Sequence, residues 1–261
     1  MNIVITGASA GIGFALAKLY AKPEITLGLI GRNKVKLESI EAICRQQGAK
    51  VVTGALDVGD EIAIKKWLLE FDKQFPVDLL IANAGVTSIM PSNGDGETWA
   101  AISHVLDTNI YGVFNSVYPL IEPMRQRKQG QIALMSSLAA FRGMPISPVY
   151  CASKAAVKSY GEALRGWLSL YGVKVSVICP GFIKSDLSDH FPEPKLLLMS
   201  TDRAAQIIYK GLIKNKALIS FPFPLNLGMK ILAIIPADIA NWILNALGYG
   251  GLRKNLPHKK V

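Results

Sequence analysis

Cysteine is scarce in this 261-residue sequence, and so are long apolar runs free of charge and proline. The three cysteines, Cys44, Cys151 and Cys179, follow neither a disulfide pattern nor a metal-ligand spacing. Such a scattered set is typical of a reducing compartment, so we expect the protein to be cytoplasmic. The uncharged runs are too short to span a bilayer. No signal peptide is expected, because a strand-like run begins at Asn2.

Histidine and acidic residues are also few. His104, His190 and His258 lie far apart in the sequence, so we expect no metal site. Lysine and arginine total 29 against 19 aspartates and glutamates, which gives a net charge of +10. The basic residues are dispersed and no nucleic-acid-binding motif is evident, so we expect no nucleic-acid partner. The charge instead favours an anionic cofactor and substrate, or an anionic membrane surface.

Apolar strand-like runs alternate regularly with helical patterns. The strand-like runs lie at residues 2–6, 26–30, 50–53, 78–82, 131–136, 174–178 and 217–220. The helical patterns lie at about 11–21, 33–47, 60–73, 98–127 (expected to be two helices), 149–171 and 201–214. This alternation predicts an α/β fold: a doubly wound, mostly parallel, seven-stranded sheet with helices on both faces. In such a sheet ligands bind at the carboxyl ends of the strands.

The first strand-like run leads into a glycine-rich turn that contains Gly7, Gly11 and Gly13. An apolar helical pattern from Phe14 to Tyr20 follows the turn. This order aims backbone N–H groups and a helix N-terminus at a phosphate. Side chains at the three glycines would obstruct a pyrophosphate or the contact of the helix with the sheet. Taken alone, the turn fits a tight strand–helix connection without a ligand equally well.

A hydroxyl, a phenol and an ammonium group follow in the second half of the chain. Tyr150 and Lys154 are four residues apart in a helical pattern, so both side chains lie on one face. Ser137 directly follows a strand-like run, thirteen residues before Tyr150. A phenol has a pKa of about 10, and a nearby cation lowers that pKa. The three groups together predict proton transfer to a carbonyl oxygen.

These motifs resemble those of the short-chain dehydrogenase/reductase family. The matches run in order from residue 2 to about residue 220 and comprise Thr6, Gly7, Gly11, Gly13, Asp57, Asn83–Ala84–Gly85, Asn109, Ser137, Tyr150, Lys154, Pro180–Gly181 and Ser185. Ala82 stands where the family usually has asparagine, and Ser185 stands where threonine is commoner. The resemblance implies a Rossmann-type fold and hydride transfer between a nicotinamide dinucleotide and a carbonyl/alcohol pair.

The resemblance also implies a role for each catalytic residue. Tyr150 would donate its proton to the developing alkoxide, and Ser137 would hold that oxygen by a hydrogen bond. Lys154 would lower the pKa of Tyr150 and bind the nicotinamide ribose. Asn109 would order a water chain from Lys154 to solvent; the alternative is a structural amide that kinks its helix.

The resemblance places the cofactor along the strand ends. The expected cofactor contacts are Gly7, Ser9, Ala10, Gly11, Ile12, Gly13, Arg32, Asp57, Val58, Asn83, Ala84, Gly85, Tyr150, Lys154, Pro180, Gly181, Ile183 and Ser185. Asp57 would bind the adenine amino group with Val58 beside the ring, unless it only forms a turn. After the second strand-like run, Gly31 and Arg32 stand where NAD-preferring enzymes place an acid. Because a guanidinium can bind a 2′-phosphate, we predict NADP(H) as the cofactor.

The substrate side is expected to be apolar. The variable loop of the family would run from Ser185 to about Thr201, where two prolines and a Leu/Met run predict an ordered lid. We expect the pocket to be lined by Phe141, Met144, Ile146 and Phe182. A solvent-exposed position is expected for Arg142, with binding of an acidic group as the alternative. These features favour a hydrophobic or bulky substrate.

The chain beyond residue 220 departs most from the family pattern. We assign residues 1–220 to a dinucleotide-binding and catalytic domain and residues 221–261 to a C-terminal helical extension of the same domain. An amphipathic stripe in the extension consists of Ile239, Trp242, Ile243, Ala246 and Leu247. A basic tail follows it. The extension either packs over the substrate pocket or makes a peripheral contact with the inner face of a membrane.

Several functions remain open on the sequence alone. The favoured one is an NADP(H)-dependent reductase of a hydrophobic or bulky carbonyl compound, assembled as a homodimer through the long helices near residues 106–127 and 149–171. A catalytically silent NADP(H)-binding scaffold or regulatory protein is the alternative from another class. A reductase of a sugar or polysaccharide precursor is a third possibility. A nucleotide-sugar epimerase is disfavoured, because such chains are longer and begin with another glycine spacing.

Overall fold

The computed structural model of the protein describes residues 1–91, 95–191, 193 and 195–250. In the described residues seven strands form one sheet: β1 (Asn2–Thr6), β2 (Thr26–Gly31), β3 (Lys50–Ala55), β4 (Leu79–Ala82), β5 (Gly130–Met135), β6 (Val173–Pro180) and β7 (Leu218–Phe221). Their order across the sheet is β3-β2-β1-β4-β5-β6-β7. Each neighbouring pair is parallel. The predicted Rossmann-type α/β fold is therefore confirmed.

The helices that lie close to the predicted positions are α1 (Gly11–Tyr20), α2 (Lys34–Gln46), α3 (Glu61–Gln74), α4 (Trp99–Leu106), α5 (Gly112–Arg127), α6 (Pro148–Ser169) and α8 (Thr201–Ile213). A further short helix, α7 (Asp186–Asp189), was not predicted and lies in the segment expected to form the variable loop. The two helices predicted at 98–127 are present as α4 and α5, and a π-helical turn, η1 (Asp107–Tyr111), joins them without a loop. A short 3-10 turn, η2 (Leu138–Ala140), follows β5. Tyr171, expected on the same helix as Tyr150, lies just beyond the end of α6.

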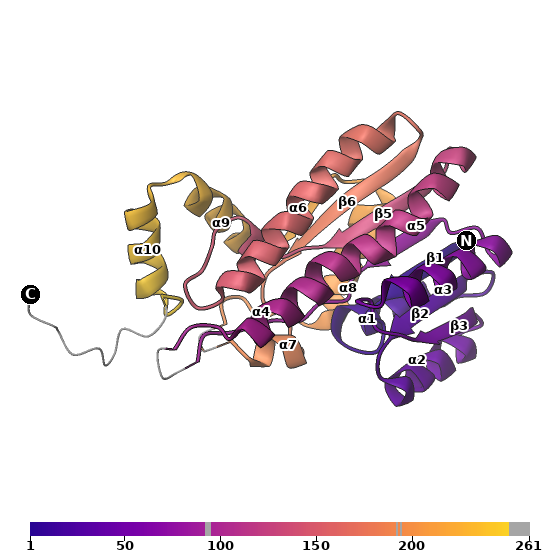
Figure 1. Ribbon diagram of the computed structural model, residues 1–261, viewed down its shortest axis with the longest axis horizontal. Coiled ribbons are helices and arrows are strands. Elements are labelled where there is room, and N and C mark those ends of the chain that lie inside the picture. Colours follow the sequence, from indigo (N-terminus) through magenta and orange to yellow (C-terminus); the bar gives the residue numbers. More distant parts are fainter. Residues whose placement is uncertain (92–94, 192, 194, 251–261) are drawn as a thin grey trace, which may run out of the picture.

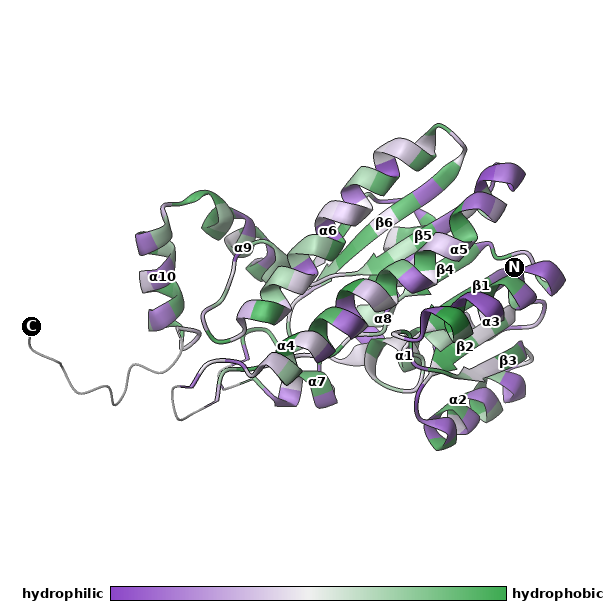
Figure 2. Cartoon of the chain, viewed as in Figure 1, coloured by the Kyte–Doolittle hydropathy of each residue, from purple (hydrophilic) through white to green (hydrophobic). Residues whose placement is uncertain are grey.

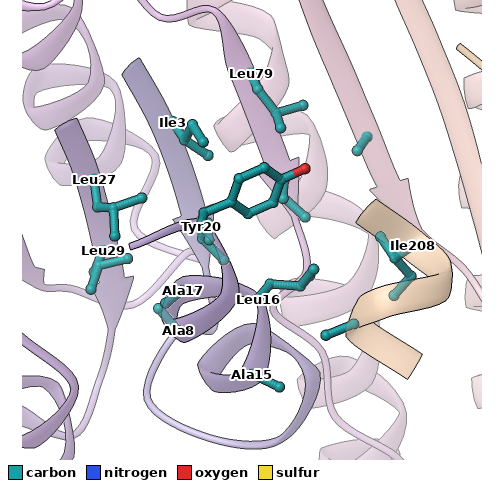
Figure 3. Packing of buried hydrophobic residues seen from close by; sticks show 14 of the residues in the cluster. Ile3, Ala8, Ala15, Leu16, Ala17, Tyr20, Leu27, Leu29, Leu79 and Ile208 are labelled. Carbon is teal, nitrogen blue, oxygen red and sulfur yellow. The ribbon is translucent and has the colours of Figure 1, made fainter. Parts of the chain in front are cut away.

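Helices cover both faces of the sheet, as Figure 1 shows. On one face, apolar side chains of α1, α2 and α8 pack against the central strands. Figure 3 shows part of this packing, in which Tyr20 of α1 lies beside Ile3 and Leu79 of the strands, and Leu16 of α1 lies between Tyr20 and Ile208 of α8. On the other face the packing helices are α3, α5 and α6. The strands are mostly apolar, which Figure 2 shows as green stretches along the arrows, because most of their residues are buried on both faces of the sheet.

Helix starts are fixed by side chains that accept hydrogen bonds from first-turn N–H groups. Asn33 caps α2, Asp60 caps α3 and Ser200 caps α8. Such caps satisfy backbone donors that the helix itself leaves unpaired. Since all strands run in one direction, their carboxyl ends lie together at one edge of the sheet, and the following loops meet there.

Two further helices, α9 (Leu225–Ile234) and α10 (Ala237–Ala246), follow β7 and stand beside the sheet at that edge. Ala240 and Leu244 of α10 are buried. Of the predicted stripe, Ile239 and Trp242 are exposed instead, so the stripe as a whole does not face the protein interior. No helix in the described part of the chain is both long enough and apolar enough to cross a membrane.

Candidate active site

A cavity of about 1120 Å³ runs along the carboxyl ends of the strands. It reaches the place where β1 and β4 are neighbours, the switch in strand order at which open α/β sheets bind ligands. The predicted site residues that line it are Gly7, Ser9, Ala10, Gly11, Ile12, Arg32, Asp57, Val58, Asn83, Ala84, Gly85, Ser137, Tyr150, Lys154, Pro180, Gly181, Ile183 and Ser185. Gly13 and Asn109 are buried and do not line it.

The glycine turn leaves room for a ligand at the start of α1. Gly7 has φ +66°, a conformation that favours glycine, and an added Cβ there would lie 2.9 Å from the Cα of Ala84. A Cβ on Gly13 would collide with the carbonyl of Gly7, so Gly13 permits close packing of α1. The N-cap residue Ala10 provides no side-chain acceptor to the first turn. The backbone N–H groups in the first turn of α1 therefore fit the pyrophosphate of a dinucleotide.

Thr6 and Asn83 tie the ends of β1 and β4 together beneath this turn. The Oγ1 of Thr6 accepts hydrogen bonds from the backbone N–H groups of Asn83 (3.0 Å) and Ala84 (3.1 Å). The Nδ2 of Asn83 donates to the carbonyls of Thr6 (2.9 Å) and Gly7 (3.2 Å). Sequence analysis matched Thr6 to a motif but gave it no function. The structure shows that it fixes the loop on which the expected cofactor contacts lie.

Two cations line the cavity near the end of β2. The Nη1 of Arg32 lies 3.5 Å from Asp57 Oδ2, and the Nζ of Lys36 lies 3.6 Å from Asp186 Oδ2. Both ion pairs are largely exposed, and such pairs contribute little to stability. An anionic ligand can therefore attract both cations. Sequence analysis missed Lys36, although it is a basic residue in the first turn of the helical pattern that follows Arg32.

Ser137, Tyr150 and Lys154 meet on the floor of the cavity. Tyr150 and Lys154 occupy consecutive turns of α6 and are both buried. The Nζ of Lys154 donates to the carbonyl of Met135 (3.1 Å) and lies 5.7 Å from the ring centre of Tyr150. Ser137 follows β5, and its Oγ accepts a hydrogen bond from the N–H of Ala139 (3.1 Å). The structure thus brings Ser137, Tyr150 and Lys154 to one place, as their spacing in the sequence predicted.

Burial governs the ionisation of both titratable groups. It raises the pKa of the Tyr150 phenol to about 12, partly offset by a hydrogen bond from Ser137. It lowers the pKa of the Lys154 ammonium to about 8. The expected lowering of the phenol pKa by Lys154 is not found in this arrangement. Loss of water around the ring is the largest cause of the raised pKa, and the Lys154 ammonium, 5.7 Å from the ring centre, does not offset it.

Asn109 lies in the π-helical turn η1 and is fully buried. Its Oδ1 accepts from the N–H of Val86 (2.8 Å), and its Nδ2 donates to the carbonyl of Val86 (2.9 Å) and to Ser153 Oγ (2.9 Å). The side chain therefore ties the segment after β4 to α6. Such π turns are frequent at functional sites. The water chain from Lys154 past Asn109 stays a prediction.

Glu97 fixes the N-terminus of the helix that carries Tyr150. The N-cap residue Ser147 turns its hydroxyl away and donates to the carbonyl of Ser88. The Oε2 of Glu97 caps the helix instead, because it accepts a hydrogen bond from the backbone N–H of Val149 (3.0 Å). Sequence analysis missed this residue. A cap that comes from 52 residues earlier leaves no local pattern in the sequence.

A chain of aromatic contacts connects Tyr150 to the end of α10. Phe191 packs edge-on against Tyr150, with ring centres 6.0 Å apart. Phe182 packs edge-on against Phe191 at 5.6 Å and stacks on Tyr249 at 5.9 Å. A residue of the variable loop therefore covers the phenol, and a residue after α10 supports that cover.

The far end of the cavity is apolar. Its hydrophobic lining residues are Met144, Phe182, Leu187, Phe191, Leu196, Leu225, Met229, Ile231, Leu232, Ile235, Ile243, Leu244 and Leu247. Those after residue 220 belong to α9, α10 and the residues next to them, so this helical pair packs over the cavity. It thereby forms a wall of the substrate side.

Four expectations about the substrate side need correction or stay untested. Met144 and Phe182 line the cavity, but Phe141 and Ile146 do not. Phe141 lies beside Lys158 (5.3 Å from Nζ to the ring centre), and Ile146 is buried in the cluster behind the lining. Arg142 donates to the carbonyl of Ala237 (3.4 Å) at the start of α10 and does not line the cavity either. Of the predicted lid, residues 192 and 194 lie outside the described residues.

Comparisons with known proteins agree with this geometry. The sequence model described as "short chain dehydrogenase" matches residues 1–195. An uncharacterized oxidoreductase of Myxococcus xanthus (strain DK1622) is 33% identical over 236 residues, which cover 89% of this chain and 92% of that protein. An 11-beta-hydroxysteroid dehydrogenase of Pinus massoniana is 31% identical, over 94% of this chain and 73% of that protein.

Among solved structures, the short-chain dehydrogenase/reductase of Burkholderia phymatum in complex with NAD superimposes with a TM-score of 0.80. It is 23% identical in sequence, and the match covers 88% of this chain and 92% of that one. At this identity the likeness supports the fold. The family model, the sequence relatives and the fold agree with the glycine turn and the Ser/Tyr/Lys set. The chain belongs to the short-chain dehydrogenase/reductase family of oxidoreductases.

Proposed function

We propose that this protein is an NADP(H)-dependent oxidoreductase that interconverts a carbonyl and an alcohol, and that it reduces a hydrophobic or bulky substrate. One observation carries the proposal: Ser137, Tyr150 and Lys154 line the same cavity as the glycine turn and the apolar lining. The bound dinucleotide supplies the hydride. The residues of the chain manage the substrate oxygen and its proton.

Tyr150 is the proton donor in this mechanism. With a pKa of about 12 the phenol is protonated at neutral pH, so it can donate to the oxygen that becomes an alkoxide. Ser137 donates a hydrogen bond to the same oxygen and stabilises its growing charge. The ammonium group of Lys154 would bind the nicotinamide ribose, the role that the family resemblance implies for it. Asn109 is a positioning residue in this proposal, because its hydrogen bonds hold the segments that carry the other groups.

The preference for NADP(H) rests on the end of β2. No acid follows β2 at Arg32 or Asn33, where it would repel a 2′-phosphate. Arg32 and Lys36 both line the cavity and hold only exposed acidic partners. A 2′-phosphate can pair with both cations. The Burkholderia phymatum structure holds NAD, so the preference proposed here rests on the residues of this chain and not on that likeness.

The apolar lining favours a hydrophobic substrate over a sugar. Hydroxyl groups of a keto-sugar would lose water against Leu232, Leu244 and Phe191 without gaining hydrogen bonds there, which costs free energy. The relative from Pinus massoniana bears a name that refers to a steroid, and this is in keeping with a bulky apolar ketone. The intact Ser137, Tyr150 and Lys154 disfavour a silent scaffold.

We also propose a homodimer through α5 and α6. Tyr111, Tyr118, Trp167 and Leu170 are large apolar residues on or next to these helices, and all are exposed in the single chain. Burying them against a second copy would remove apolar surface from water. The division into a catalytic part, residues 1–220, and a helical extension of the same domain, residues 221–261, remains part of the proposal. The cytoplasmic location stays a prediction.

Loss of NADPH absorbance tests the proposed function. The purified protein is offered apolar ketones, acyl-chain ketones and keto-sugars, and the rate of the Tyr150→Phe variant is subtracted. Turnover of an apolar ketone with NADPH, faster than with NADH, is the expected result. NADPH binding without turnover of any compound would favour the silent scaffold, and turnover of keto-sugars alone would reverse the substrate assignment.

A further inference from the structure

The outer surface of α9 and α10 is apolar, although nothing in the described part of the chain covers it. The exposed large apolar residues of this hairpin are Phe223, Leu227, Ile231, Ile234, Ile239, Trp242 and Leu247. The side chains of Ile234 and Trp242 are 83% and 70% exposed. Seven large apolar residues exposed on one pair of helices are typical of a contact with another protein or with a membrane.

The inner surface of the same two helices is the wall of the substrate cavity. Met229 and Leu232 of α9 and Ile243 and Leu244 of α10 line that cavity. Each helix is therefore apolar on two sides, one facing the cavity and one facing outward. A helix that served only as a lid would need only the inner apolar side, with polar residues outside.

Two residues belong to both surfaces. Ile231 and Leu247 line the cavity, and they are also 50% and 42% exposed. The cavity therefore reaches the exterior beside the exposed apolar surface of the hairpin. An apolar compound can pass from that surface into the cavity without crossing a polar rim at these two residues. This continuity distinguishes an entry route from an isolated apolar patch.

The charge of the extension favours an anionic occupant. In the sequence after Phe221 the basic residues are Lys230, Arg253, Lys254, Lys259 and Lys260, against the single acid Asp238. Lys230 lies on α9 and is exposed, whereas 251–261 fall outside the described residues and enter only through their charge. A second copy docked on this surface would bring two positive segments together. An anionic lipid surface attracts the segment, by about 1 kcal/mol for each basic residue near it.

We propose that the α9–α10 hairpin docks on an anionic lipid surface and admits an apolar carbonyl compound dissolved in that surface to the cavity. The entry step rests on the proposed reductase function, whereas the docking step does not. The contact is peripheral, because each helix has ten residues and is about 15 Å long, too short to span a bilayer. The apolar side lies among the acyl chains, and Lys230 of α9 meets the headgroups.

Sedimentation with vesicles tests the docking step without cofactor or substrate. The vesicles are of phosphatidylglycerol mixed with phosphatidylcholine, or of phosphatidylcholine alone, at low and high salt. The test variant is Ile234→Glu with Trp242→Glu, neither of which lines the cavity. The control is Ile62→Glu with Trp99→Glu, the same residue types at 81% and 76% exposure on α3 and α4.

The wild type and the control are expected to sediment with anionic vesicles at low salt and to bind more weakly at high salt. The test variant should lose at least ten-fold in partitioning. Wild-type protein that stays in solution with anionic vesicles, or a test variant that binds like the control, would overturn the proposal. A third result would also overturn the proposal. In it, sedimentation velocity shows that the wild type is a dimer and the test variant a monomer, while no vesicle binding is observed.

Turnover separates the entry step from the reductase function. All three proteins should reduce a short, water-soluble ketone at equal rates. Only the test variant should be slow with a long-chain ketone presented in vesicles. Vesicle binding without any turnover would contradict the reductase function and leave the docking intact. Turnover in vesicles that is equal for all three proteins would overturn the entry route.

Discussion

The two ends of the cavity are built from different material. At the cofactor end, backbone groups of the glycine turn, the Thr6–Asn83 hydrogen bonds and two cations form the wall. At the substrate end the wall is made of apolar side chains, many from helices that follow the last strand. Hydrogen bonds and close backbone contacts determine what the cofactor end can bind, whereas the volume of the cavity determines what the substrate end can bind. Substitutions should therefore act through chemistry at one end and through packing at the other.

The largest effect is expected where the two ends meet. Tyr150→Phe removes the proton donor and should lower kcat by about 10²–10⁴-fold, the usual contribution of an acid–base group. The fold and the affinity for NADPH, measured by fluorescence titration, should stay unchanged. Tyr160→Phe, on the same helix α6, is the control and should keep the wild-type rate. A Tyr150→Phe variant with near-native turnover would be evidence against the assigned mechanism.

At the substrate end, Leu244→Ala should act through packing. Leu244 is buried in the cluster that also contains Tyr150, so its truncation should destabilise the fold by about 2–4 kcal/mol. The KM for an apolar ketone should rise while the KM for NADPH stays constant. Ile234→Ala on the neighbouring helix, exposed, should change stability by less than about 0.5 kcal/mol. Equal losses in the two variants, measured by urea unfolding, would show that α10 does not bury Leu244.

At the cofactor end, Arg32→Asp should act through charge. The ratio of kcat/KM for NADPH to that for NADH should fall by about 10- to 100-fold, as expected when a charge-assisted hydrogen bond is replaced by repulsion. Arg203→Asp makes the same charge change on α8, away from the cavity, and should leave the ratio unaltered. An unchanged ratio in Arg32→Asp would remove the basis for the NADP(H) preference.

The smaller of the two expected changes in stability concerns the buried ammonium group. Burial lowers the Lys154 pKa from its ordinary value of 10.5 to about 8, so the unfolded chain binds more protons between these pH values. Stability should therefore rise with pH across this window, and the cost of burying the charge is complete below pH 8. Lys154→Met should be inactive yet more stable at pH 7 by about 1–3 kcal/mol. That advantage should shrink as the pH rises to 10.5; an advantage independent of pH would contradict the assigned cause.

The contrast between the two ends also explains how far the sequence could predict them. Gly7, Tyr150 and Lys154 were predicted because their chemistry requires particular residue types at fixed local spacings. Glu97 was missed because its partner Val149 lies far away in the sequence. Asn109 was found, but its three hydrogen bonds to protein groups could not be read from the sequence.

At the substrate end, the apolar composition of the wall was predicted, but the directions of individual side chains were not. The sequence indicated an apolar wall but placed Phe141 and Ile146 in it, whereas both pack elsewhere. In α10, apolar residues occupy exposed positions as well as buried ones. Which of them turn inward depends on the contacts with Phe182 and Phe191, and these are fixed only in three dimensions.

The family match ends at residue 195, before the helices that shape the far end of the cavity begin. Much of the apolar wall therefore comes from a stretch that the family model does not cover, whereas Met144, Phe182, Leu187 and Phe191 lie within the matched residues. Replacing the residues after β7 with those of a relative would change which substrates can bind, while the residues at the strand ends stay the same. Because Tyr249 supports the phenylalanines that cover Tyr150, such an exchange would have to carry that support along.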